Sequence, residues 1–91
     1  MDYLPLPGTA VEDLDTPAII VDLDIAESNI KAMADFAKEN GVSMRPHMKT
    51  GKSPFWARKL MDAGAIGVCA AKVGEAEILA DGGIPEILIP N

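Results

Sequence analysis

Three basic side chains alternate with apolar ones along one short segment of the sequence. Arg45, His47 and Lys49 occupy alternate positions of 42–49, and each directly follows an apolar residue: Met44, Pro46 and Met48. Because successive side chains of a β-strand point to opposite faces, this pattern predicts a strand with one apolar face and one basic face. Lys49 ends the strand, and barrel enzymes build their active sites at the carboxyl ends of strands.

The chemistry that this arrangement suggests is attack by an amine on a carbonyl carbon. Burial and a neighbouring cation both disfavour the ammonium form of a lysine. A neutral lysine amine forms Schiff bases with carbonyl substrates or with pyridoxal phosphate. A lone lysine is usually a surface residue, but the Arg45 and His47 side chains expected on the same face favour a functional Lys49.

The rest of the sequence predicts strands and helices in alternation. Strands are predicted over 16–23, 42–49, 65–71 and 86–89. Helices are predicted from Asp24 to Asn40-Gly41, from Ser53-Pro54 to about Ala63, and around 74–80. Asp24 followed by Glu27 resembles a capping box, and Ser53-Pro54 is a cap followed by proline at the first helical position. Glycine follows each helix, so a helix–strand unit repeats along the chain.

Such alternation is typical of the α/β class with a parallel sheet. No strand is followed by the G-x-G-x-x-G pattern of dinucleotide-binding layers, which favours a barrel. Four strands cannot close a (β/α)8 barrel, which needs about 250 residues. We therefore expect the N-terminal part of a (β/α)8 TIM-type barrel, incomplete in this chain.

Composition narrows the class of protein. The 91 residues carry a formal net charge of -6 and are 48% hydrophobic, which is a globular composition. The acidic balance argues against nucleic acid as a partner, since phosphate binding needs clustered basic residues. Cys69 is the single cysteine, and no apolar run approaches membrane-spanning length. The expected location is the cytoplasm.

Four motifs in order carry a family resemblance. They are Leu14-Asp15-Thr16-Pro17-Ala18, Val21-Asp22-Leu23-Asp24, Arg45-Pro46-His47-Met48-Lys49-Thr50, and Gly67-Val68-Cys69 with Glu75-Ala76-Glu77. Together they resemble the D-threonine aldolase and D-serine dehydratase family, fold-type III pyridoxal-phosphate enzymes related to alanine racemase. The resemblance covers about 14–91, and the Arg-Pro-His-x-Lys-Thr run is its most specific part.

The resemblance implies a role for each residue of this run. Lys49 corresponds to the lysine that forms the internal aldimine with pyridoxal phosphate. His47 is expected to orient the cofactor or the lysine, with a structural histidine as the equal alternative. Arg45 is expected to support the site from deeper in the barrel. Thr50 is the remaining cofactor-binding candidate, although a turn residue is the simpler interpretation.

The resemblance also implies a domain organisation. Residues 1–15 are an irregular lead-in. The strand over 16–23 would then join a separate β-rich C-terminal domain, and 24–91 would form the first βα units of the barrel. The strand over 42–49 becomes the first strand of that barrel.

The implied function is that of a pyridoxal-phosphate-dependent lyase acting on small D-amino acids, as an aldolase or a dehydratase. Its implied divalent metal (Mn, Mg or Zn) would take its ligands from outside this chain, and the full-length enzyme would be a homodimer. We expect the 91 residues alone to be inactive. The alternatives are a racemase on the same scaffold, a non-catalytic pyridoxal-phosphate carrier, and a cofactor-free interaction fragment.

One residue departs from the family pattern, and several others invite simpler explanations. Family members commonly carry a histidine at the position of Gly51, so the resemblance does not fix which substrate is used. Cys69 is expected to be a buried small side chain, and Lys72 to be exposed. Asp22 and Asp24 could suggest a metal pair, but a helix cap explains Asp24 better. Core positions are expected at Met33, Met44, Met48 and Trp56.

Overall fold

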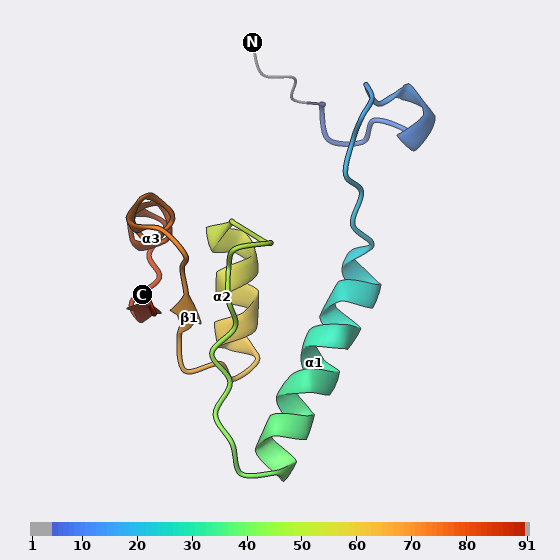
Figure 1. The fold of residues 1–91 in the computed structure, drawn as a ribbon. Helices are drawn as coiled ribbons and strands as arrows, with labels where there is room; N and C mark the ends of the chain where they lie inside the picture. Colours follow the sequence, from blue (N-terminus) through green and yellow to red (C-terminus); the bar gives the residue numbers. More distant parts are fainter. Residues whose placement is uncertain (1–4, 91) are drawn as a thin grey trace.

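The computed structural model describes residues 5–90, in which helices alternate with short extended segments (Figure 1). The elements are η1 (Val11–Asp13), α1 (Leu23–Glu39), α2 (Pro54–Asp62), β1 (Val68–Cys69), α3 (Val73–Asp81) and β2 (Ile87–Leu88). None of the helices in this part of the chain is long and apolar enough to cross a membrane. Three of the helices match predicted ones, and both strands lie within predicted strands.

A parallel arrangement of three backbone segments holds the α/β part together. β1 pairs with β2 in parallel, with Val68 opposite Ile87 and Cys69 opposite Leu88. On its other edge Cys69 forms a parallel bridge with His47. Residues 66–70, here called the middle segment, therefore lie between the chain before Lys49 and β2. The predicted parallel α/β sheet is confirmed for these segments.

Pro46 explains why the predicted strand over 42–49 shrinks to a single bridge at His47. Around that bridge the Cys69 N–H donates to the Pro46 carbonyl, and the Met48 N–H donates to the Cys69 carbonyl, both at 2.8 Å. The next rung would need an N–H at position 46, which proline lacks. The register changes there, and the Ile66 N–H donates to the Met44 carbonyl at 2.9 Å instead.

The start of α1 corrects two predictions. Its cap is Asp22, whose carboxylate accepts from the Ile25 N–H at 3.2 Å, whereas Asp24 lies inside the first turn. The predicted capping box of Asp24 and Glu27 is therefore wrong. Glu27 pairs instead with Lys59 of α2 at 2.5 Å, across the space between the two helices. The end of α1 is as predicted, with Gly41 in the left-handed region at a φ of 65°.

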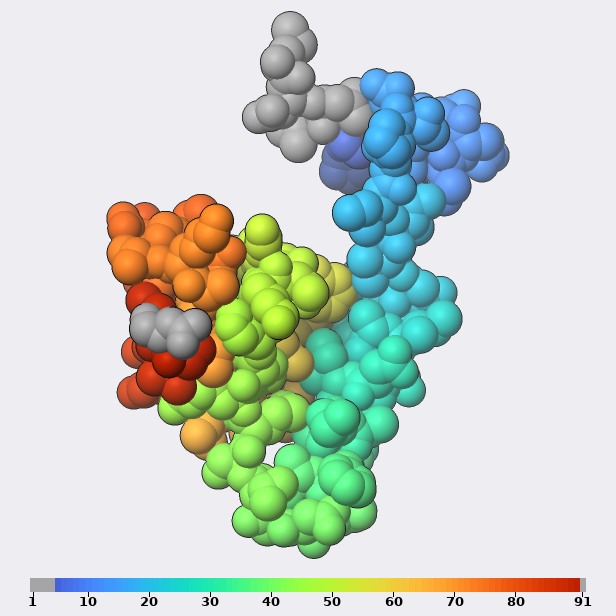
Figure 2. All heavy atoms as spheres, viewed as in Figure 1, coloured from blue at the N-terminus to red at the C-terminus, as the bar shows by residue number. Residues whose placement is uncertain are grey.

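The predicted strand over 16–23 is not formed. None of these residues is in a strand, and Leu23 already belongs to α1. Ile19 is 97% exposed, and no described segment pairs with it. Figure 2 shows this stretch, in blue, projecting beyond α1 and away from the sheet. The proposed β-rich partner domain for it remains a prediction.

The core lies between the three parallel segments, α2 and α3. Its buried members are Met48, Ala57, Val68, Ala70, Leu79 and Ile84. α2 begins as predicted: the Ser53 hydroxyl accepts from the Phe55 N–H at 3.2 Å, and Pro54 follows at the first helical position. Trp56 packs against the core and Met48 is 2% exposed, as predicted, but Met33 of α1 is 57% exposed, so that core position is wrong.

Gly67 leaves no room for a side chain at the start of β1. A Cβ there would lie 2.5 Å from Nη1 of Arg45 and 2.8 Å from both Cβ and the carbonyl oxygen of Glu86. The Arg45 side chain is thereby packed over the backbone of the middle segment, and Glu86 approaches from the other side. Glycine at this position lets both neighbours come close.

We predict that Gly67→Ala destabilises the protein by about 1–3 kcal/mol, the usual cost of overpacking a close-packed site. Chemical unfolding measures the change. The matched control is Gly74→Ala in α3, where a Cβ meets nothing within 4 Å. Since alanine favours a helix over glycine, the control should be neutral or stabilising. Equal stability of Gly67→Ala and the wild type would contradict the packing seen here.

Candidate functional site

Lys49 lies where the chain leaves the sheet at its carboxyl edge. Residues 48–51 form a turn that the Lys52 N–H closes by donating to the Met48 carbonyl at 2.8 Å. Met48 is fixed twice: its side chain is buried, and its N–H donates to Cys69. The residue before Lys49 is therefore held firmly, while Lys49 itself belongs to the turn and not to a strand.

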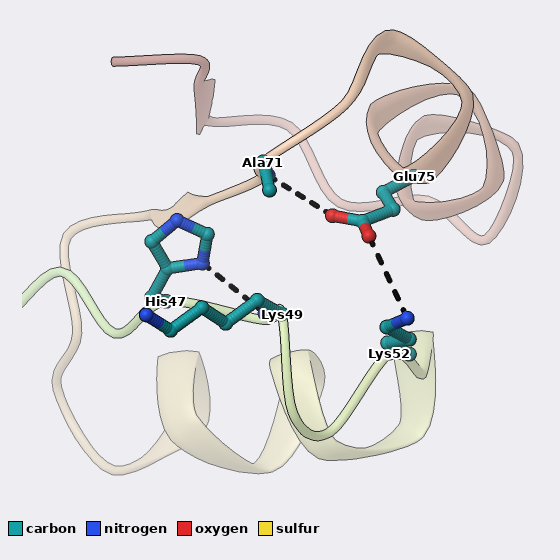
Figure 3. A network of polar contacts seen from close by, with 5 residues as sticks. All are labelled: His47, Lys49, Lys52, Ala71 and Glu75. Carbon is teal, nitrogen blue, oxygen red and sulfur yellow. Dashed lines mark hydrogen bonds and ion pairs between the residues drawn. The ribbon is translucent and has the colours of Figure 1, made fainter. Parts of the chain in front are cut away.

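The His47 ring holds the backbone of this turn. Its Nδ1 accepts a hydrogen bond from the Lys49 N–H at 3.1 Å. Figure 3 shows this bond and the Lys49 side chain extending from the same turn. An accepting Nδ1 carries no proton, so the ring's donor in its neutral form is Nε2. The structure thus gives His47 a contact with Lys49 through the main chain.

Arg45 and Thr50 are the other two predicted site residues. Arg45 is half-buried and packs over Gly67, two residues before Cys69 along the middle segment. Thr50 is exposed within the turn. The structure brings His47 and Lys49 into contact and places the Arg45 side chain against Gly67 of the neighbouring segment. Cofactor binding by these four residues stays a prediction.

The expected burial of Lys49 is not found. Its side chain is exposed at the edge of the sheet, and among residues 5–90 no hydrogen bond or ion pair engages its Nζ. The basic column of the sequence pattern is also interrupted, because the strand ends before Lys49. The amine is thus accessible to solvent and has no partner within the part of the chain that the structure describes.

Gly51, the departure from the family pattern, is the last residue of this turn. A Cβ at this position would lie 3.1 Å from the Met48 methyl group and 3.7 Å from Cβ of Trp56. A Cβ here would require the methyl group of Met48, a core residue, to shift by a few tenths of an ångström. The glycine therefore lets the turn close over Met48 and Trp56.

Glu75 is the residue of this region that sequence reasoning missed. Its Oε1 accepts from the Ala71 N–H at 2.9 Å, and its Oε2 lies 3.9 Å from Nζ of Lys52 (Figure 3). The hydrogen bond from Ala71 lowers the pKa of the Glu75 carboxyl, and the Lys72 N–H and the charges of Lys52 and Lys72 add to this against an opposing effect of burial. Glu75 is the third residue of α3, where a glutamate often reaches back to the residues before a helix. That spacing was a signal in the sequence.

The remaining candidates have structural explanations. Cys69 is free and half-buried, with its Sγ 3.9 Å from the Arg45 carbonyl oxygen. Lys72 is exposed, as predicted. Asp22 caps α1, and the described residues contain no group of three or more His, Cys, Asp or Glu side chains that could hold a metal ion.

The sequence is similar to three curated enzymes. It is 44% identical over 92 residues to 3-hydroxy-D-aspartate aldolase of Paracoccus denitrificans. It is 39% identical over 85 residues to D-threonine aldolase of an Arthrobacter species, and 41% identical over 75 residues to D-threo-3-hydroxyaspartate dehydratase of a Delftia species. These matches cover 99%, 93% and 82% of the chain but only 24%, 22% and 20% of the relatives. The chain therefore spans about a quarter or less of their length.

Solved structures agree with the sequence matches. The fold superposes on D-threonine aldolase of Filomicrobium marinum with a TM-score of 0.84 and 51% identity, covering 87% of this chain and 21% of that one. It superposes on a mutant of D-threo-3-hydroxyaspartate dehydratase with a TM-score of 0.82 and 39% identity, covering 87% and 20%. No family model matches the chain. Sequence and fold together confirm, over this stretch, the predicted kinship with the D-threonine aldolase and D-serine dehydratase family.

Proposed function

We propose that this chain carries the cofactor lysine of a pyridoxal-phosphate-dependent lyase that acts on small D-amino acids. The observation that carries the proposal is the placement of Lys49. It follows directly on the parallel backbone ladder at the carboxyl edge of the sheet, within the Arg-Pro-His-x-Lys-Thr run, in a chain whose relatives are named aldolases and a dehydratase. In barrel enzymes this edge is where substrates and cofactors bind.

The residues present fit a covalently held aldehyde cofactor. The Lys49 Nζ is accessible and has no partner among residues 5–90, so the amine can react without first breaking an ion pair. The backbone on its amino side is held by Met48, and its own N–H is held by His47. Pyridoxal phosphate, when bound, supplies an electron sink for negative charge that develops at the substrate Cα.

The chain's own residues would then position and transfer protons. Lys49 would hold the cofactor, and its amine, when not bonded to the cofactor, would accept or donate a proton. His47 limits the reach of that amine, because its bond to the Lys49 N–H fixes the start of the side chain. Arg45 keeps the neighbouring segment packed through its position over Gly67.

The remainder of the proposal concerns the whole enzyme. An aldolase of this kind breaks the Cα–Cβ bond of a β-hydroxy-D-amino acid, whereas a dehydratase eliminates water. We propose that this chain contributes βα units to an alanine racemase-like barrel in a homodimeric, cytoplasmic enzyme. We assign the divalent metal implied by the resemblance to none of the described residues.

Two other functions on this scaffold are separable by assay. A racemase requires proton-transfer groups on both faces of the cofactor, and it would change only the optical purity of its substrate. A non-catalytic carrier would show the visible absorbance of the cofactor without turnover. The names of the relatives favour the lyase.

We predict that borohydride reduction of the full-length protein with pyridoxal phosphate fixes the label on the peptide that contains Lys49. Lys49→Ala should lose the label and lower turnover by about 10²–10⁴-fold, the contribution of one positioned acid–base group. Peptide mapping and steady-state rates measure both effects.

Lys72→Ala is the matched control for this experiment. Lys72 is an exposed lysine that follows the middle segment at the same edge of the sheet. Its replacement should leave labelling and turnover as in the wild type. Label recovered on Lys72 or on another lysine, with Lys49 unmodified, would refute the assignment.

The reaction type is predicted to show in the products. With a β-hydroxy-D-amino acid, an aldolase releases an aldehyde and a shorter amino acid, and a dehydratase releases ammonia and a keto acid. We expect one of these product pairs from the D-substrate and none from its L-enantiomer, because the named relatives are enzymes of D-amino acids. Racemised substrate without either product pair would favour the racemase.

A further inference from the structure

The Glu75 carboxylate joins two segments that meet at the carboxyl edge of the sheet. One oxygen accepts from Ala71, the residue that directly follows the middle segment. The other faces Lys52, the residue whose N–H closes the turn that contains Lys49. Figure 3 shows the carboxylate between these two groups. A single side chain of α3 thus contacts both the strand end and the lysine turn.

The turn needs such support because of the backbone conformation of Lys52. Its φ is 44°, and among the described residues Lys52 is the only one other than glycine with a positive φ. The left-handed region is unfavourable for a residue with a Cβ, and it persists where surrounding contacts hold it. Two contacts do so here: the bond from its N–H to Met48, and the ion pair of its Nζ with Glu75.

Glu75 makes two contacts, one with the Ala71 N–H and one with Lys52, which differ in distance and exposure. The Glu75 side chain is 18% exposed, and it lines a small, mainly apolar cavity with Met48, Lys52, Ile78 and Leu79. The Lys52 side chain is 65% exposed and 3.9 Å away, so its ion pair is open to solvent and to screening by salt. The charged hydrogen bond from the Ala71 N–H is 2.9 Å long, which makes it the closer of the two contacts. Met48, which immediately precedes Lys49, is part of the same cavity wall.

We propose that Glu75 is a positioning residue for Lys49, because it ties the turn of 48–52 to the end of the middle segment through Ala71 and Lys52. The role of Lys49 rests on the proposed function, whereas the tie itself is a property of the fold. The charges that face Glu75 at this edge are those of Lys52 and Lys72. Glu75 touches neither cofactor nor substrate in this proposal and acts through the geometry of the turn.

The test compares Glu75→Ala and Glu75→Gln with Glu77→Ala in the full-length protein. Glu77 is an exposed glutamate of the same helix and serves as the matched control. Hydrogen exchange of the Lys52 amide reports on the turn without any cofactor. Visible circular dichroism per bound pyridoxal phosphate, with kcat and KM measured separately, reports on the orientation of the cofactor lysine.

In Glu75→Ala we expect the Lys52 amide to exchange about tenfold faster, the factor expected for loss of a hydrogen bond to a charged group. The dichroism per bound cofactor and kcat should fall, with KM changed less than kcat. Glu75→Gln keeps an acceptor for Ala71 and should lie between Glu75→Ala and the wild type. Glu77→Ala should match the wild type in every measurement.

Several results would overturn the positioning role. They are unchanged Lys52 exchange in Glu75→Ala, equal losses in Glu75→Gln and Glu75→Ala, or an unchanged dichroism per bound cofactor. If Glu75→Ala does not fold, the salt dependence of Lys52 amide exchange is compared between Glu75→Gln and the wild type. Added salt should speed this exchange in the wild type only. An equal response in both proteins would overturn the role. A wild type that binds no pyridoxal phosphate would instead refute the proposed function. The two failures are distinguishable, because exchange of the Lys52 amide is measured without the cofactor.

Discussion

The backbone hydrogen bonds of the middle segment, 66–70, are the constraint on which the α/β part depends. This short stretch is bonded on one side to the chain before Lys49 and on the other side to β2. Its side chains Val68 and Ala70 are fully buried, so α2 and α3 pack on a surface that it provides. Gly67 permits this close approach from both sides, since a side chain there would strike Arg45 and Glu86. The middle segment also positions the site, because the backbone of Cys69 is hydrogen-bonded to Pro46 and Met48, the residues on either side of His47.

Local signals in the sequence predicted two helix ends that local interactions decide. Ser53-Pro54 specified the start of α2, and Gly41 specified the end of α1, because a cap and a left-handed residue act within a few residues of the chain. The strand over 16–23 failed for the opposite reason: a strand exists only through a paired neighbour, and the described chain offers it none. Met33 failed as a core residue because the outer face of α1 is not covered here.

The site was partly predictable for similar reasons. The alternation in 42–49 located Lys49 at a strand end. It could not show that Pro46 would remove a rung of the ladder before His47, or that a turn would begin at Met48. It also could not bring Glu75 to Lys52, since these residues are 23 positions apart and meet only through the packing of α3 against the sheet. The position of Glu75 as the third residue of α3 predicts a hydrogen bond to the backbone before the helix, but not its contact with Lys52.

The exposed stretch Ile19-Ile20-Val21 has a consequence for the behaviour of the polypeptide in solution. These are consecutive β-branched residues, all exposed, in an extended segment whose backbone groups no described strand pairs. Such a segment is a template for intermolecular β-pairing, and the prolines and charges that usually block such pairing flank it only at Pro17 and Asp22. Self-association of the 91-residue polypeptide should therefore begin here and increase with concentration, with Pro17 and Asp22 acting as gatekeepers at its two ends.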